Sequence, residues 1–193
     1  MEAFVNSTLA VAIAEIGDKT QLLALFLAAR YSRPFMISFG VFAATIFNHA
    51  LSAWLGSWLA DTIPTHWIPW IISASFVAIA IWILVPDKED DSMGRFAEYG
   101  PFLATLILFF LAEIGDKTQI ATVVLAAKYN ETLWMTLSVI AGTTFGMLLA
   151  NVPVIFAGKW IMDRLPLNVA RKSAFVLFMA LAVITLVSMK GEI

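Results

Sequence analysis

The chain has 193 residues, of which 61% are hydrophobic and 13% charged, and its mean hydropathy is +0.86. This composition excludes an ordinary soluble domain and indicates an integral membrane protein. A net charge of −2 argues against a nucleic-acid partner, and the lack of cysteine excludes disulfides, thiolate metal ligands and thiol catalysis.

About 20 consecutive apolar residues carry a helix across the hydrocarbon core of a bilayer. Six segments of the chain meet this length and predict six transmembrane helices: 4–29, 34–59, 67–85, 101–127, 132–158 and 169–189. The only long polar stretch, residues 86–100, contains an acidic cluster. We therefore divide the chain into a first three-helix repeat (1–85), an acidic linker (86–100) and a second three-helix repeat (101–193).

The first predicted helix contains the octapeptide Ala-Glu-Ile-Gly-Asp-Lys-Thr-Gln at 14–21, and the fourth contains the same octapeptide at 112–119. A charged side chain at the centre of a bilayer costs about 2.5–3.5 kcal/mol, so two identical charged copies indicate a function. On a continuous helix, Glu15 and Asp18 would lie three residues apart on one face. Gly17 leaves room for a second backbone, or lets the helix loosen locally.

The second half of the chain repeats the first. The fourth helix aligns with the first at an offset of 98 residues (Ala14 with Ala112), and the fifth with the second at an offset of 102 (Gly40 with Gly142). Because each half has three spans, an odd number, we expect the two copies to be inverted relative to each other. Such an inverted repeat is typical of secondary transporters, which bind substrate near the membrane midplane.

Lysine and arginine residues outside the spans predict the orientation, since they accumulate in cytoplasmic loops. One side holds Arg30, Arg33, Lys88, Arg95, Lys159, Arg164, Arg171 and Lys172, and the other holds Lys128 and Lys190. Both termini are therefore expected outside, with the acidic linker in the cytoplasm.

Inversion brings the two octapeptides together as a candidate metal site. The candidate ligands are Glu15, Asp18, Gln21, Glu113, Asp116 and Gln119. Their hard oxygen atoms suit Ca²⁺, Mn²⁺ or Mg²⁺. The four carboxylates and two lysines of the motifs sum to a charge of −2, which one divalent cation or two protons neutralise. Crowded buried carboxylates readily take up protons, so the motifs predict exchange of a divalent cation for protons.

Neighbouring polar residues are candidates for supporting roles. They are Lys19, Thr20, Asn48, Lys117, Thr118 and Asn151. The lysines are either permanent counter-ions of the carboxylates, which we favour, or residues whose ammonium groups reach the membrane interface. Asn48, its neighbour His49, and Asn151 are candidate ligands or partners of the ligands, and an interhelical hydrogen bond is the alternative for each.

The doubled Glu-x-Gly-Asp-Lys-Thr motif, at 15–20 and 113–118 with three helices apiece, resembles the Gdt family of cation/proton exchangers. That family includes Golgi proteins handling Ca²⁺ and Mn²⁺ and bacterial manganese exporters of the MneA type. The resemblance covers the whole chain. It implies an acidic cation site made by the two motifs and export from the cytosol, with no separate cofactor. The short N-terminus looks bacterial and favours Mn²⁺ export across the inner membrane.

Three alternatives stay open. A Ca²⁺/H⁺ exchanger needs the same ligand set. An intramembrane aspartyl protease needs two membrane aspartates, such as Asp18 and Asp116, although the adjacent lysines oppose a shared proton. A non-transporting membrane scaffold would use the ion pairs to fix helix register. The expected partners are a divalent cation, protons and the lipid bilayer, while the oligomeric state is left open by the sequence.

Overall fold

The computed structural model describes residues 1–85, 99–158 and 167–190. Within these ranges the chain forms eight α-helices and no β-strand. They are α1 (Glu2–Glu15), α2 (Lys19–Tyr31), α3 (Pro34–Thr62), α4 (Ile68–Ile83), α5 (Gly100–Glu113), α6 (Lys117–Lys128), α7 (Leu133–Ala157) and α9 (Leu167–Lys190). The predicted all-α class is confirmed for these residues, and nearly all of the predicted acidic linker lies outside them.

The predicted spans coincide with helices in the described ranges. α3, α4, α7 and α9 each correspond to one predicted span, whereas the first and fourth predicted spans are each divided, into α1 with α2 and α5 with α6. Of the described helices, α3 and α7 are long and apolar enough to cross a membrane singly; α4, α5 and residues 172–187 are shorter apolar helices. Large side chains such as Phe35, Trp54 and Trp134 remain exposed, as on a surface that contacts an apolar environment.

The first octapeptide breaks the first predicted span into two helices. α1 ends at Glu15, Ile16 is extended, Gly17 has a φ of +81°, and Asp18 is the N-cap of α2. Glycine adopts a positive φ at little steric cost, and the Asp18 side chain accepts a hydrogen bond from the Lys19 amide at 2.7 Å. The expectation of a continuous helix, with both carboxylates on one face, is therefore wrong. The chain instead loosens at Gly17.

The second octapeptide breaks the fourth span in the same way. α5 ends at Glu113, Ile114 is extended, Gly115 has a φ of +75°, and Asp116 is the N-cap of α6. Each break therefore places a glutamate at the end of one helix and an aspartate at the start of the next. The N-terminus of a helix carries partial positive charge, which favours an anionic aspartate there.

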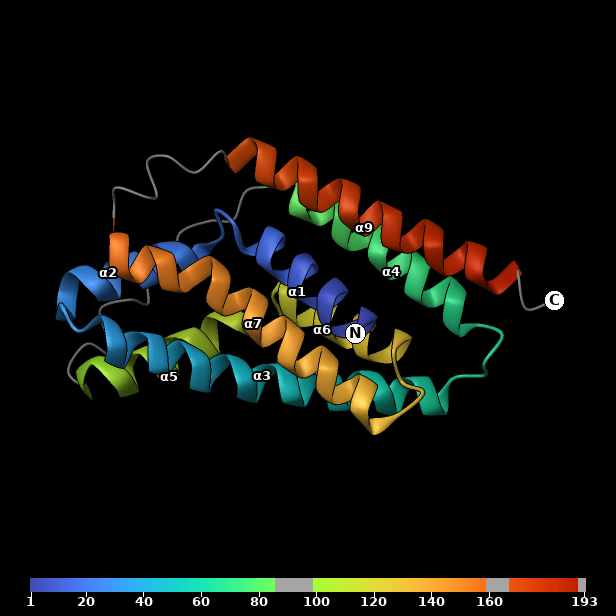
Figure 1. Ribbon diagram of the computed structural model, residues 1–193, viewed down its shortest axis with the longest axis horizontal. Helices are drawn as coiled ribbons and strands as arrows, with labels where there is room; N and C mark the ends of the chain where they lie inside the picture. The colour runs from blue at the N-terminus through green and yellow to red at the C-terminus, as the bar shows by residue number, and fades with distance from the viewer. Residues whose placement is uncertain (86–98, 159–166, 191–193) are drawn as a thin grey trace.

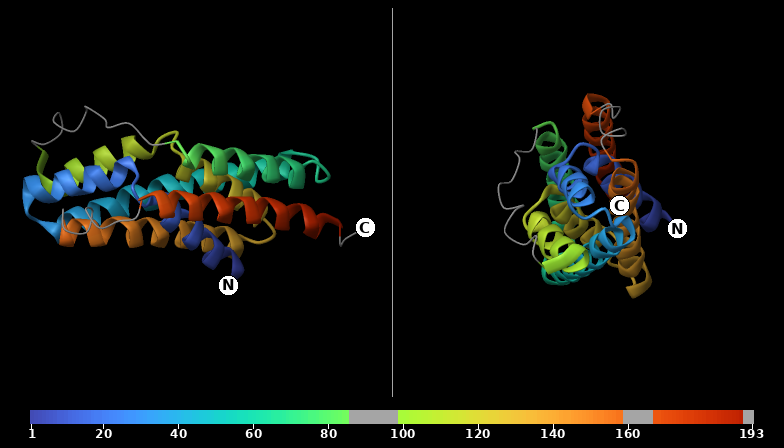
Figure 2. Two further views of the ribbon diagram at one scale, coloured as in Figure 1. Left: turned by 90° about the horizontal axis from the view of Figure 1, so that it is seen from above. Right: turned by 90° about the vertical axis from the view of Figure 1, so that its left-hand side faces the viewer.

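The helices run roughly along the long axis of the molecule (Figures 1 and 2). α1 packs against α7, and α3 packs against both α5 and α6. α4 and α9 lie side by side along one edge of the bundle (Figure 1). All of these pairs join the first half of the chain to the second, so both motif breaks lie between helices of the two halves.

Two glycines make equivalent close contacts in the two halves. A Cβ atom on Gly40 of α3 would lie 2.9 Å from the carbonyl oxygen of Phe102 on α5. A Cβ atom on Gly142 of α7 would lie 2.5 Å from the carbonyl oxygen of Phe4 on α1. Gly40 and Gly142 are matched at an offset of 102, and Phe4 and Phe102 at an offset of 98. The repeat in the sequence is therefore accompanied by a repeat of helix contacts.

Candidate metal centre

Three carboxylates from the two motifs meet in the protein interior. Oxygen atoms of Glu15, Glu113 and Asp116 lie within 4.8 Å of one another, and the three residues are at most 3% exposed. Two ionised carboxylates at such a separation repel by about 3 kcal/mol at an effective dielectric constant of about 20. A cation or protons bound among these oxygens would remove that repulsion, so the arrangement suits a positively charged ligand.

Two threonines position the glutamates. The Thr20 hydroxyl donates to Glu15 Oε2, and the Thr118 hydroxyl lies 3.0 Å from Glu113 Oε2 and 3.3 Å from Asp116 Oδ2. Both threonines are fully buried and follow the helix break, so each ties a glutamate to the start of the next helix. The other oxygen of each glutamate, Oε1, is buried and has no hydrogen-bond partner among the described residues. Buried acceptors are normally satisfied, and these two remain available to a ligand.

Asp18 lies outside the group of three carboxylates and pairs with a lysine of the other motif. Lys117 Nζ lies 3.3 Å from Asp18 Oδ1, and both side chains are buried. In the reciprocal pair, Lys19 Nζ lies 3.6 Å from Asp116 Oδ1, and the Lys19 side chain is 25% exposed. Each lysine is thus a counter-ion of the aspartate in the opposite motif. This geometry agrees with the counter-ion interpretation, and the burial of Lys117 argues against an ammonium group at the membrane interface.

The two motif glutamines accept hydrogen bonds from the backbone of the helix breaks. Gln21 Oε1 accepts a hydrogen bond from the Gly17 amide at 2.8 Å, and Gln119 Oε1 accepts one from the Gly115 amide at 2.7 Å. Gln21 also donates to the carbonyl oxygen of Ala150 on α7 at 2.9 Å. An amide oxygen has two lone pairs, so one on each glutamine is left for another partner. Their role as metal ligands stays a prediction.

Three further polar residues are fully buried on α3 and α7. Asn48 donates to the carbonyl oxygen of Phe110 on α5 at 3.2 Å, which is the interhelical hydrogen bond given as the alternative to metal binding. Asn151 donates within its own helix to the carbonyl oxygen of Met147 at 3.1 Å. The Oδ1 atoms of both asparagines, and both ring nitrogens of His49, have no hydrogen-bond partner among the described residues.

The combined donor set fits a hard divalent cation. Carboxylate and amide oxygens are the ligands preferred by Mn²⁺, Ca²⁺ and Mg²⁺, and the chain has no thiol. Buried charges are tolerated only when they are paired or bind ions. Among the described residues, the two aspartates have lysine partners, whereas the hydrogen-bond partners of the glutamates are threonine hydroxyls. A bound cation or proton would therefore stabilise the two buried glutamates more than the two aspartates.

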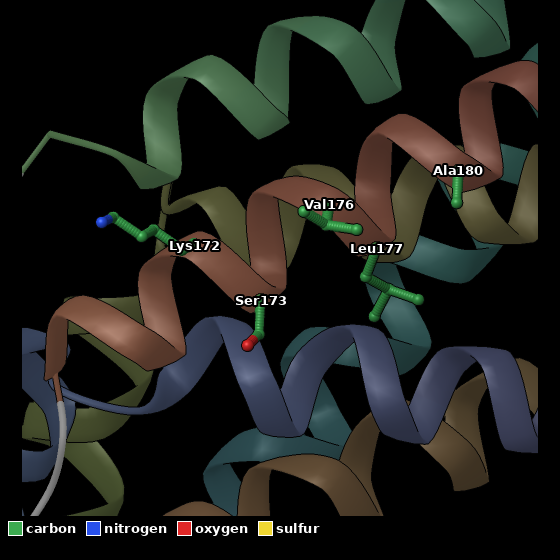
Figure 3. Close-up of a pocket in the computed structure, with 5 residues that line it drawn as sticks. All are labelled: Lys172, Ser173, Val176, Leu177 and Ala180. Carbon is green, nitrogen blue, oxygen red and sulfur yellow. The ribbon is translucent and has the colours of Figure 1, made fainter.

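A cavity lies along α9, and its chemistry differs from that of the motif carboxylates. Its volume is about 520 Å³, and its lining residues, shown in Figure 3, are Lys172, Ser173, Val176, Leu177 and Ala180. These residues offer one hydroxyl oxygen and no carboxylate. The cavity lacks the ligands of a divalent cation, and the motif carboxylates remain the candidate metal centre.

Sequence reasoning missed the crossed pairing of lysines and aspartates. On a continuous helix Lys19 and Glu15 would be one turn apart, and each lysine would lie beside a carboxylate of its own motif. Because the helix breaks between them, Lys19 and Glu15 are not one turn apart on the same helix. The glycine within each motif was the available signal, since a glycine inside an apolar helix often marks a point where the backbone departs from helical geometry.

The sequence model of a family described as "Divalent cation/proton antiporter GDT1" matches residues 3–91 and 101–193 of the chain. A Vibrio cholerae serotype O1 protein with the name "Putative manganese exporter" is 50% identical over 186 residues, covering 96% of this chain and 90% of that protein. A GDT1-like protein of Synechocystis sp. is 27% identical over 206 residues, covering 96% and 97%. GDT1-like protein 5 of Arabidopsis thaliana is 25% identical over 226 residues, covering 97% and 96%. No solved structure matches the chain with significance.

Proposed function

Because the chain belongs to the GDT1 family of divalent cation/proton antiporters, we propose that it exports Mn²⁺ from the cytoplasm in exchange for protons through a site built from its two motifs. Family membership makes the chain a divalent-cation transporter and not an enzyme. The protease and scaffold alternatives are therefore set aside. The name of the Vibrio cholerae relative supports Mn²⁺ as the ion.

The observation that carries the proposed site is the meeting of Glu15, Glu113 and Asp116 within 4.8 Å, with both motifs contributing. These three carboxylates are the proposed central ligands. Asp18, which is in an ion pair with Lys117, is proposed as the fourth acidic ligand. The motif charge of −2 is neutralised by one Mn²⁺ on one leg of the cycle and by two protons on the other. The glutamates and aspartates thus serve as ligands and proton carriers.

The proposal extends to the architecture of the protein in the membrane. Six spans arranged as two inverted three-helix repeats are supported by the matched glycine contacts of α3 and α7 and by the matched helix breaks. We place both termini outside and the protein in the bacterial inner membrane, from the distribution of lysine and arginine along the sequence. Five of the eight cationic residues on the proposed cytoplasmic side, namely Lys88, Arg95, Lys159, Arg164 and Arg171, lie where side chains are not described.

Ca²⁺ is the alternative ion, because all carboxylates and amides of the two motifs offer oxygen and Ca²⁺ is bound by oxygen ligands. Inside-out membrane vesicles distinguish the two ions. Uptake of Mn²⁺, Ca²⁺ and Mg²⁺ is measured with and without an imposed proton gradient, together with proton movement out of the vesicle lumen.

Glu113→Gln tests the site in the same vesicles, since it removes one central carboxylate while preserving size and a hydrogen-bond acceptor. Its matched control is Glu131→Gln, at an exposed glutamate outside the motifs. We expect Glu113→Gln to abolish Mn²⁺ uptake and Glu131→Gln to leave it unchanged. Uptake that neither moves protons nor responds to the proton gradient would contradict exchange. Full activity of Glu113→Gln would contradict the site.

A further inference from the structure

His49 of α3 is a fully buried imidazole. Its exposed fraction is 0%, and neither Nδ1 nor Nε2 has a partner among the described residues. A buried polar group that lacks a hydrogen bond destabilises the fold, and a bound ion or water molecule can supply the missing partner. The proposed transport site described above does not use this side chain.

The packing of α3 places His49 at the level of the second motif. Asn48, its neighbour, donates to the carbonyl oxygen of Phe110, three residues before Glu113. Gly56 packs on the carbonyl oxygen of Val123, at 2.1 Å from an added Cβ atom. Val123 lies seven residues after Asp116, and Gly56 lies seven residues, or two turns, after His49. Residues two turns apart share a helix face, so His49 lies on the face of α3 that packs against α6 at Gly56.

We propose that His49 supplies a nitrogen ligand to the transported cation and thereby selects Mn²⁺ over Ca²⁺; this rests on the proposed function. The three carboxylates that meet within 4.8 Å do not include His49. Coordination of a cation held by these carboxylates therefore requires the imidazole to turn toward the start of α6. Ca²⁺ and Mg²⁺ take oxygen ligands, whereas first-row transition cations also accept imidazole. One nitrogen among the oxygens thus favours a transition cation.

The corresponding position in the other half offers only oxygen. His49 matches Asn151 of α7 at the offset of 102. The Asn151 amide group donates to Met147, and its Oδ1 is buried with no hydrogen-bond partner in the described part of the chain. The two halves therefore contribute unlike donors at matched positions. Only the α3 side carries the nitrogen that discriminates between the two classes of cation.

Pulsed electron paramagnetic resonance of bound Mn²⁺ tests this assignment directly, because a coordinated imidazole modulates the Mn²⁺ signal through its nitrogen. The chain contains two histidines, and the second, His66, is exposed in the turn before α4. The full-length protein is purified without a histidine tag. His49→Gln and the matched control His66→Gln are compared with the unaltered chain, each loaded with Mn²⁺ alone. His66→Gln protein labelled with ¹⁵N-histidine reports on His49 without altering it.

We expect ¹⁴N modulation in the unaltered chain and in His66→Gln, its loss in His49→Gln, and its replacement by a ¹⁵N pattern in the labelled control. We also expect His49→Gln to lower the ratio of Mn²⁺ to Ca²⁺ affinity about tenfold or more, as loss of a metal-site partner does. Absence of ¹⁴N modulation in the unaltered chain overturns the inference, and so does its persistence in His49→Gln. Glu113→Gln is measured in parallel. If it loses Mn²⁺ binding, the proposed site stands whatever His49 does.

Discussion

The two crossed ion pairs predict unequal effects of removing their lysines. Lys117 Nζ lies 3.3 Å from Asp18, and the two side chains are 4% and 0% exposed. Lys117→Met leaves the aspartate buried without this counter-ion, and breaking a buried pair in this way costs about 3–5 kcal/mol. Lys19 Nζ lies 3.6 Å from Asp116, but its side chain is 25% exposed and water screens the pair. Lys19→Met should therefore cost about 1 kcal/mol or less.

The measurement is the free energy of unfolding in mixed micelles, followed through the fluorescence of the seven tryptophans. The Asp18→Asn/Lys117→Met double variant is the control, because removing both charges leaves neither one unpaired and should restore part of the stability. Equal losses for the two lysine variants would contradict the reasoning. So would a double variant no more stable than Lys117→Met alone.

Three other changes give separate expectations. Gly56→Ala should lower the free energy of unfolding by about 1–3 kcal/mol, because its Cβ would lie 2.1 Å from the Val123 carbonyl oxygen and would push α3 away from α6. Chemical unfolding measures this loss. Unchanged stability would contradict the close packing of α3 on α6. Thr118→Val should weaken Mn²⁺ binding about tenfold by freeing Glu113, and Thr118→Ser should restore it, as a binding titration can check. Burial raises the pKa of the Tyr129 hydroxyl, so the folded chain favours its protonated form. That stability is fully present below the unfolded pKa of about 10 and is lost as pH rises through the folded value. Tyr129→Phe should show a smaller alkaline loss in a pH series of unfolding curves.

The positions of the helices and the grouping of the acids were predictable from the sequence. Apolar length located the six stretches that contain the described helices, because burial and lipid contact both require apolar residues over the same stretch. The doubled motif predicted that acids of the two halves meet, and Glu15, Glu113 and Asp116 do so. The first conclusion follows from long apolar stretches and the second from a repeated octapeptide. Neither depends on whether the local backbone is a continuous or a broken helix.

The departures from prediction all arise at the helix breaks. Hydropathy runs through 14–21 without interruption, so it cannot distinguish one helix from two. The left-handed Gly17 and the capping Asp18 end the first helix, and the two carboxylates then leave the common face that a continuous helix would give. The pairing of Lys117 with Asp18 spans 99 residues and depends on how the halves pack. No local pattern encodes such a contact.

The ion pairs also make a prediction about the electrical balance of transport. Asp18 and Asp116 each face a lysine of the opposite motif, so the uncompensated charge of −2 resides on Glu15 and Glu113, one from each half. Threonine hydroxyls orient both glutamates but supply no charge. One divalent cation neutralises the pair, and after its release two protons restore the same neutrality. Exchange should therefore carry no net charge, and the rate of Mn²⁺ uptake into vesicles clamped with potassium and valinomycin should be independent of membrane potential. A rate that rises with an imposed potential would mean that one of the two glutamates keeps its proton throughout the cycle, or that a lysine joins the exchange.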